Sequence, residues 1–102
     1  MTVKKYDKLV RDRIPEIIES NGKRCKIQIA SEEEYALKLK EKLLEEANEF
    51  FENPSIEELA DVQEVIAAIV KLNNWDVWDA RLDKNTERGA FKNRYILKEV
   101  SE

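Results

Sequence analysis

Four carboxylates with regular spacing are the residues in this sequence best suited to chemistry. Glu46 and Glu49 form an ExxE pair, and Glu58 and Asp61 form an ExxD pair. Residues three apart lie on one face of a helix, so each pair can point in one direction. Carboxylates favour hard cations such as Mg²⁺ or Mn²⁺. The spacing therefore favours a divalent metal site, provided that two helices bring the pairs together.

The residue types that are missing narrow the chemistry further. The 102 residues contain no histidine, one cysteine (Cys25) and two glycines (Gly22 and Gly89). This composition excludes histidine bases and histidine ligands, a zinc–thiolate cluster, and a glycine-rich phosphate loop or dinucleotide fingerprint. Metal-assisted hydrolysis by carboxylates is the chemistry that remains.

Two capping boxes predict the helices that must position the carboxylates. Ser31–Glu34 predicts a long helix that runs to about Phe51, and Asn53-Pro54 breaks it. Ser55–Glu58 is the second capping box and opens a helix that runs to about Leu72. A short link makes consecutive helices antiparallel neighbours. We therefore expect a helical hairpin.

The hairpin predicts where the four carboxylates lie. At roughly 100° per residue, Glu46 and Glu58 fall within the apolar arcs of their helices, and Glu49 falls at the edge of its arc. Asp61 falls between two apolar residues, whereas Glu57 lies on the polar side. Glu49 and Glu58 are equally far from the turn, and so are Glu46 and Asp61, so the four should meet at one level. Desolvating four anions costs several kcal/mol each unless a cation compensates.

Simpler explanations exist for single members of this set. Glu58 is also the third residue of a capping box, where an acidic side chain favours the helix start. Acids can also fall three apart by chance in a charged helix. Neither explanation covers two inward pairs at one level. Glu45 is a lesser candidate, because its angle points outward.

The rest of the chain is predicted to form shorter elements. Pro15 can open a short helix that ends at Gly22. Residues 25–29 alternate apolar and polar side chains, as a short strand does. A third long helix is expected from near Asp76 to just before Gly89. Extended segments are expected at both ends: the arm 6–13, and the tail 95–97 as a short strand or an extended segment.

Several segments of the sequence resemble one enzyme family. Residues 43–50 and 57–62 are similar to the paired acidic motif of the MazG-like all-α nucleotide pyrophosphohydrolases, whose superfamily includes phosphoribosyl-ATP pyrophosphohydrolase. Residues 6–12 and the segment Lys84…Arg88–Phe91 resemble a short subgroup of that family. The resemblance implies an all-α fold whose helical hairpin completes a four-helix bundle in a homodimer or homotetramer. It implies that Mg²⁺, or Mn²⁺ in its place, is held by four catalytic carboxylates: Glu46, Glu49, Glu58 and Asp61.

The implied reaction is hydrolysis of a nucleoside triphosphate, NTP or dNTP, between the α and β phosphates. The products are a monophosphate and pyrophosphate, which would suit house-cleaning of the nucleotide pool. Glu49 is our candidate for the proton acceptor from the attacking water. Basic side chains must neutralise the outer phosphates; the chosen candidates are Lys8, Arg11, Lys84 and Arg88, and the lesser ones are Arg13, Lys92 and Arg94. Trp75 and Trp78 are expected in a core, with stacking on a base as the alternative.

The length, charge and composition of the chain lead to predictions about its domain number, partners, localisation and oligomeric state. The chain is expected to be a single domain over residues 1–102. Its net charge of −4 argues against a nucleic-acid polymer as partner, and no apolar run suits a membrane. A lone cysteine and an N-terminus without a signal pattern fit the cytoplasm. Wide apolar arcs indicate a homo-oligomer. Two alternatives stay open: phosphoribosyl-ATP pyrophosphohydrolase, and a non-catalytic helical dimerisation module.

Overall fold

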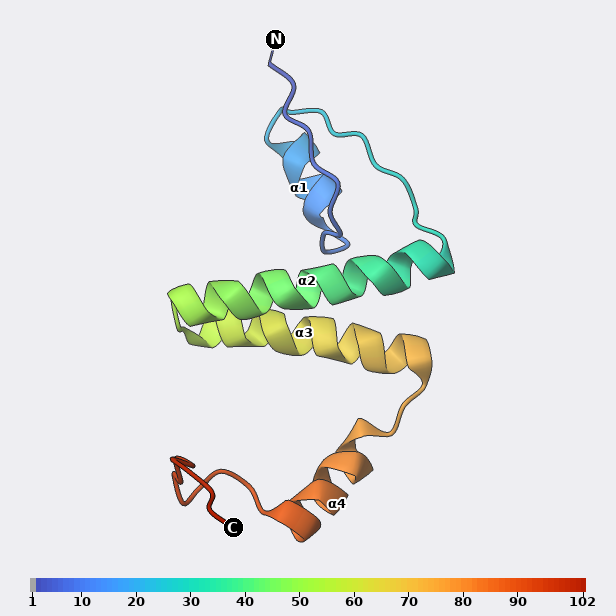
Figure 1. The fold of residues 1–102 in the computed structure, drawn as a ribbon. Helices are drawn as coiled ribbons and strands as arrows, with labels where there is room; N and C mark the ends of the chain where they lie inside the picture. The colour runs from blue at the N-terminus through green and yellow to red at the C-terminus, as the bar shows by residue number, and fades with distance from the viewer. Residues whose placement is uncertain (1) are drawn as a thin grey trace.

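The computed structural model describes residues 2–102 and contains helices joined by extended segments (Figure 1). The helices of this part of the chain are α1 (Ile14–Ser20), α2 (Glu32–Glu52), α3 (Ile56–Asn73) and α4 (Val77–Arg88). Residues 2–102 form no strand, which confirms the all-α prediction. No helix within the same range has the length and apolar composition that crossing a bilayer requires.

The short strand predicted for residues 25–29 is wrong. This segment has no regular structure, and Ile27 and Ile29 are exposed. A strand is stable only when other strands pair with it and cover one of its faces. No described segment pairs with residues 25–29, so the apolar alternation has nothing to pack against. Residues 95–97 form no strand, which leaves the other alternative predicted for them, an irregular extended segment.

Side-chain caps fix the beginnings of the three longer helices. The Ser31 hydroxyl accepts a hydrogen bond from the backbone N–H of Glu34, and the Ser55 hydroxyl accepts one from Glu58, both at 3.1 Å. The Asp76 carboxylate caps α4 in the same way. Such caps satisfy N–H groups that the first helical turn leaves without partners. The predicted starts of both hairpin helices and the expected third helix are thus confirmed.

The α2–α3 hairpin holds the small core of the protein. Its helices pack side by side after the link that contains Pro54 (Figure 1). Leu39 on α2 and Val65 on α3 are the buried apolar residues of the described chain. Two such residues are a very small core for a chain of this length, which leaves much of the apolar surface uncovered.

The remaining elements extend away from the hairpin. The N-terminal arm and α1 lie on one side of it, and α4 with the C-terminal tail lies on the other (Figure 1). The radius of gyration is 18.7 Å, whereas a compact domain of 100 residues has about 13 Å. Among the helices of residues 2–102, therefore, α2 and α3 are the pair that positions residues relative to one another across an extensive packed interface.

Candidate metal centre

Three of the four predicted carboxylates meet across the hairpin. One oxygen from each of Glu46, Glu58 and Asp61 lies within 4.8 Å of the other two. Glu46 comes from α2, and the other two come from α3. The fourth, Glu49, is exposed and is not part of this group, although its charge acts on Glu58. Antiparallel packing and equal distances from the turn account for the meeting of Glu46 with Asp61, and Glu58 precedes Asp61 by three residues on the same helix face.

Two of the carboxylate oxygens in this cluster lack hydrogen-bond donors. Glu46 is only 7% exposed, and its Oε2 has no hydrogen-bond partner. Glu58 Oε2 is also buried without a partner. A buried acceptor without a donor is unfavourable, more so when it is charged. The cluster therefore presents two acceptor oxygens that a cation or a donor would satisfy.

Lys42 is a member of this site that sequence reasoning missed. Its Nζ lies 3.3 Å from Glu46 Oε1 and 3.4 Å from Glu45 Oε1, and its side chain is mostly buried. The available signal was its spacing, because residues four apart on a helix are neighbours and Lys42 precedes Glu46 by four. Glu45, expected on the outward face, is half-buried and also lies 3.4 Å from Lys8.

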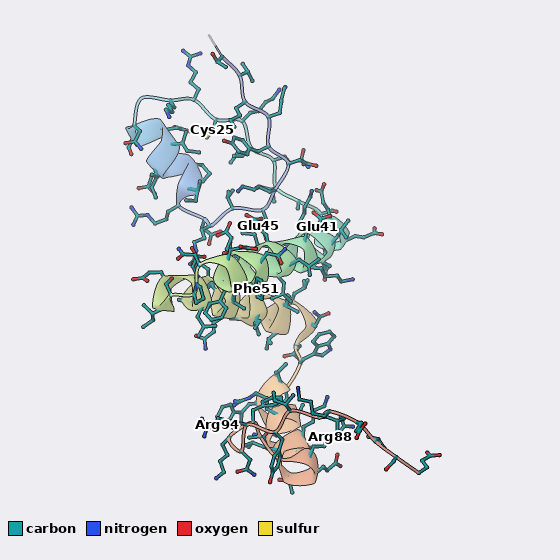
Figure 2. All side chains as sticks on the ribbon, turned by 60° about the vertical axis from the view of Figure 1, so that its left-hand side comes forward. Cys25, Glu41, Glu45, Phe51, Arg88 and Arg94 are labelled. Atoms are coloured by element: carbon teal, nitrogen blue, oxygen red, sulfur yellow. The ribbon has the colours of Figure 1, made fainter. Side chains whose placement is uncertain are left out.

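The N-terminal arm brings two of the predicted phosphate-binding residues to the hairpin. Arg11 Nη2 lies 2.8 Å from Asp61 Oδ1. Lys8 Nζ pairs with Glu45 on the side of α2 that faces the arm (Figure 2). Arginine and lysine at these positions thus lie beside the carboxylates rather than in bulk solvent.

The other two predicted phosphate-binding residues are not at this site. Lys84 and Arg88 lie on α4, and no ion pair involves either of them within residues 2–102. Arg88 lies with Arg94 on the opposite side of the hairpin from the arm (Figure 2). A single chain therefore does not join α4 to the carboxylate cluster. Trp75 and Trp78, which were expected in a core, are exposed.

Crowding of the carboxylates changes the acidity of Glu58. Burial raises the pKa of Glu58 above its ordinary value, and the negative charge of Glu49 adds to the increase. The charge of Asp61, a hydrogen bond with the Glu49 carboxyl and the charge of Glu46 raise this pKa further. Each effect disfavours the ionised form of Glu58. A cation at the cluster would oppose all of the charge effects.

Comparisons with known proteins assign no family to this chain. No family model, no curated protein and no solved structure matches the chain. The resemblance of residues 43–50 and 57–62 to the MazG-like enzymes therefore stays a prediction. The site contains carboxylate oxygens that can act as hard metal ligands, and two of these oxygens have no hydrogen-bond partner. Two basic side chains, Arg11 and Lys42, lie beside them.

The raised pKa of Glu58 predicts how metal-free stability depends on pH. Stability linked to Glu58 is fully present below the ordinary glutamate pKa and is lost as pH rises through the raised pKa of the folded state. Glu58→Gln cannot ionise and keeps the backbone cap to Ser55. In EDTA, its free energy of unfolding should therefore match wild type at about pH 4 and exceed it at about pH 7. Urea denaturation at both pH values measures this.

Glu57→Gln is the matched control, because Glu57 is the exposed neighbour of Glu58 on the same helix turn. Its stability relative to wild type should be the same at both pH values. If Glu58→Gln gains no more stability with rising pH than Glu57→Gln does, the carboxylates do not repel one another in the folded protein.

Proposed function

We propose that this protein is a Mg²⁺-dependent nucleotide pyrophosphohydrolase, which converts an NTP or dNTP and water into a monophosphate and pyrophosphate. The observation that carries the proposal is the meeting of Glu46, Glu58 and Asp61 across the hairpin, with Oε2 of Glu46 and of Glu58 lacking donors. These are hard oxygen ligands, and the chain has no histidine that would favour softer metals. The donor set fits Mg²⁺ or Mn²⁺.

The spacing of the oxygens supports this fit. Mg²⁺ binds oxygen at about 2.1 Å in an octahedron, so neighbouring ligands are about 3 Å apart and opposite ligands are about 4.2 Å apart. The three carboxylate oxygens lie within 4.8 Å of one another, so side-chain rotation would be needed to bring them to these separations around an ion. Three protein ligands leave positions for water and phosphate oxygens. A bound Mg²⁺ would polarise the phosphoryl group and lower the pKa of a bound water.

The side chains around the cluster suit the other roles in this reaction. Glu49 is exposed beside Glu58 and is our candidate to accept the proton of the attacking water. Lys8 and Arg11 on the arm are candidates to neutralise the outer phosphates. Lys84 and Arg88 lie on α4, away from the cluster, so we propose that they act only where α4 of another copy approaches it.

Uncovered apolar surface on the hairpin supports self-association into a four-helix bundle. Leu37, Leu44 and Phe51 are exposed on α2 and lie seven residues apart, which places them on one face. On α3, Leu59 and Ile66 are also exposed and seven apart. Two hairpins that pack these faces together would bury them at roughly 25 cal/mol per Å². We propose a homodimer or homotetramer.

A non-catalytic dimerisation module is the second candidate, and one observation favours it. Lys42 and Arg11 already pair with Glu46 and Asp61, so part of the negative charge is neutralised by the chain itself. In that case the cluster would be structural, and a metal would add little. Phosphoribosyl-ATP pyrophosphohydrolase differs from the main proposal only in substrate, which a screen of nucleotides for pyrophosphate release would identify.

Glu46→Gln tests the enzyme proposal. We expect Mg²⁺-dependent release of pyrophosphate by wild type, and turnover lower by about a hundredfold or more in Glu46→Gln, since a metal ligand is lost. A metal bound only by the native state stabilises it by about 2.7 kcal/mol at a hundred times Kd. Added Mg²⁺ should therefore raise the melting temperature of wild type more than that of Glu46→Gln.

Glu57→Gln, on the exposed face of α3, should keep both the turnover and the metal-induced shift of wild type. Three results would contradict the enzyme proposal. These are full activity in excess EDTA, release of orthophosphate with a nucleoside diphosphate, and a Glu46→Gln protein that melts well below wild type without metal while Mg²⁺ shifts both equally. The last result would make Glu46 a structural residue.

Leu44→Lys tests the proposed bundle. A lysine at the centre of the α2 stripe would place a charge in the buried interface, so the variant should sediment as a 12.0 kDa monomer at micromolar concentration while wild type sediments as a dimer or tetramer. Ile29→Lys is the control, because Ile29 is exposed on an irregular segment outside the hairpin. Wild type that is itself monomeric under these conditions would refute the bundle.

A further inference from the structure

Arg11, on the N-terminal arm, forms an ion pair with Asp61, which is one of the carboxylates proposed to hold the metal. Its Nη2 lies 2.8 Å from Asp61 Oδ1, a distance typical of a charge-assisted hydrogen bond. The Arg11 side chain is 56% exposed, so it reaches the cluster from its solvent side. Asp61 is therefore the one carboxylate of the cluster whose partner comes from outside the hairpin.

Two further ties hold the arm along α2. Lys38 Nζ donates to the backbone carbonyl of Asp7 at 2.8 Å and lies 3.3 Å from its carboxylate. The hydrogen bond with Asp7 raises the pKa of Lys38, as expected for a lysine held by an acceptor. Lys8, the next residue of the arm, forms an ion pair with Glu45 of α2. These ties do not involve Arg11, so they would hold residues 7–8 on the hairpin if the Arg11–Asp61 pair opened.

A divalent cation at the cluster would compete with Arg11. Both need the negative charge of Asp61, and two cations on one carboxylate repel each other. An exposed ion pair contributes no more than about 1 kcal/mol, so metal coordination can displace it. Because the Lys8 and Asp7 ties remain, the displaced guanidinium stays near the site rather than leaving with the arm.

We propose that Arg11 is a built-in counter-ion, which a divalent metal displaces from Asp61 and which then binds a phosphate of the substrate. This inference rests on the proposed function. A guanidinium presents parallel N–H donors that match two phosphate oxygens, whereas a lysine offers a point charge. In this order of events the metal binds first and releases Arg11 from Asp61. The free guanidinium then binds the polyphosphate of the substrate.

Mn²⁺ titration by calorimetry tests the competition without measuring activity. Arg11→Gln should bind Mn²⁺ with a Kd roughly threefold to fivefold lower than wild type, because no ion pair must be broken. Arg11→Lys keeps the charge and should remain close to wild type. Arg13→Gln is the matched control, because Arg13 is two residues away and pairs only with Glu16, and it should leave the Kd unchanged.

Limited trypsin digestion followed by mass spectrometry tests the displacement itself. Mn²⁺ should accelerate cleavage after Arg11 at least about twofold relative to cleavage after the exposed Arg24, since a released arginine fits the protease. With saturating Mn²⁺, Arg11→Gln should bind inorganic tripolyphosphate roughly tenfold more weakly than Arg24→Gln does, because Arg24 is exposed and has no proposed phosphate role.

The outcomes of these experiments distinguish failure of the proposed metal centre from failure of the proposed role of Arg11. If wild type binds no Mn²⁺, the metal centre is wrong and this inference falls with it. If wild type binds Mn²⁺ but Arg11→Gln binds it equally or more weakly, or if Mn²⁺ slows cleavage after Arg11, the metal centre stands and the displacement of Arg11 is refuted. Equal tripolyphosphate binding by the two variants refutes the phosphate role.

Discussion

Mutual repulsion among carboxylates on the inner face of the α2–α3 hairpin is the constraint on which the rest of the structure depends. The packed faces of α2 and α3, which bury Leu39 and Val65, also bring Glu46, Glu58 and Asp61 together. Burying those groups opposes folding, because each carboxylate loses water and meets like charge. Cations that neutralise these carboxylates should therefore stabilise the hairpin, and Lys42 and Arg11 each pair with one member of the cluster.

Basic side chains of the chain neutralise only part of the negative charge of the cluster. Lys42 forms an ion pair with one oxygen of Glu46, and Arg11 forms an ion pair with one oxygen of Asp61. The second oxygen of Glu46 and one of Glu58 remain without a donor, and the pKa of Glu58 is raised accordingly. An incompletely neutralised cluster of this kind is unfavourable for stability, and under the proposed function it would represent the trade-off between stability and activity that active sites show.

The sequence predicted the parts of the fold that short-range rules control. Capping boxes and breakers located α2 and α3, and their symmetry about the turn placed Glu46 and Asp61 at one level. The strand prediction for residues 25–29 failed because a strand depends on a partner elsewhere in the chain. The inward position of Lys42 was available from its spacing to Glu46, yet its pairing there depends on rotamer choice that periodicity does not fix.

The positions of the arm and of α4 relative to the hairpin could not be predicted from the sequence. No local rule determines the path of the arm, so the Arg11–Asp61 pair could not be predicted. The same holds for α4, whose position keeps Lys84 and Arg88 away from the cluster within one chain. Glu49 was correctly placed at the edge of its apolar arc, but whether an edge residue joins a cluster depends on small rotations of packed helices, and here it stays exposed.

Anomalous diffraction from crystals grown with Mn²⁺ tests the central claim most directly. We expect a peak bounded by the carboxylates of Glu46, Glu58 and Asp61, at about 2.2 Å from at least one oxygen of each. A map with no peak at this position, in crystals where Lys42 and Arg11 still pair with Glu46 and Asp61, would contradict it. The cluster would then be a structural ion-pair network rather than a metal centre.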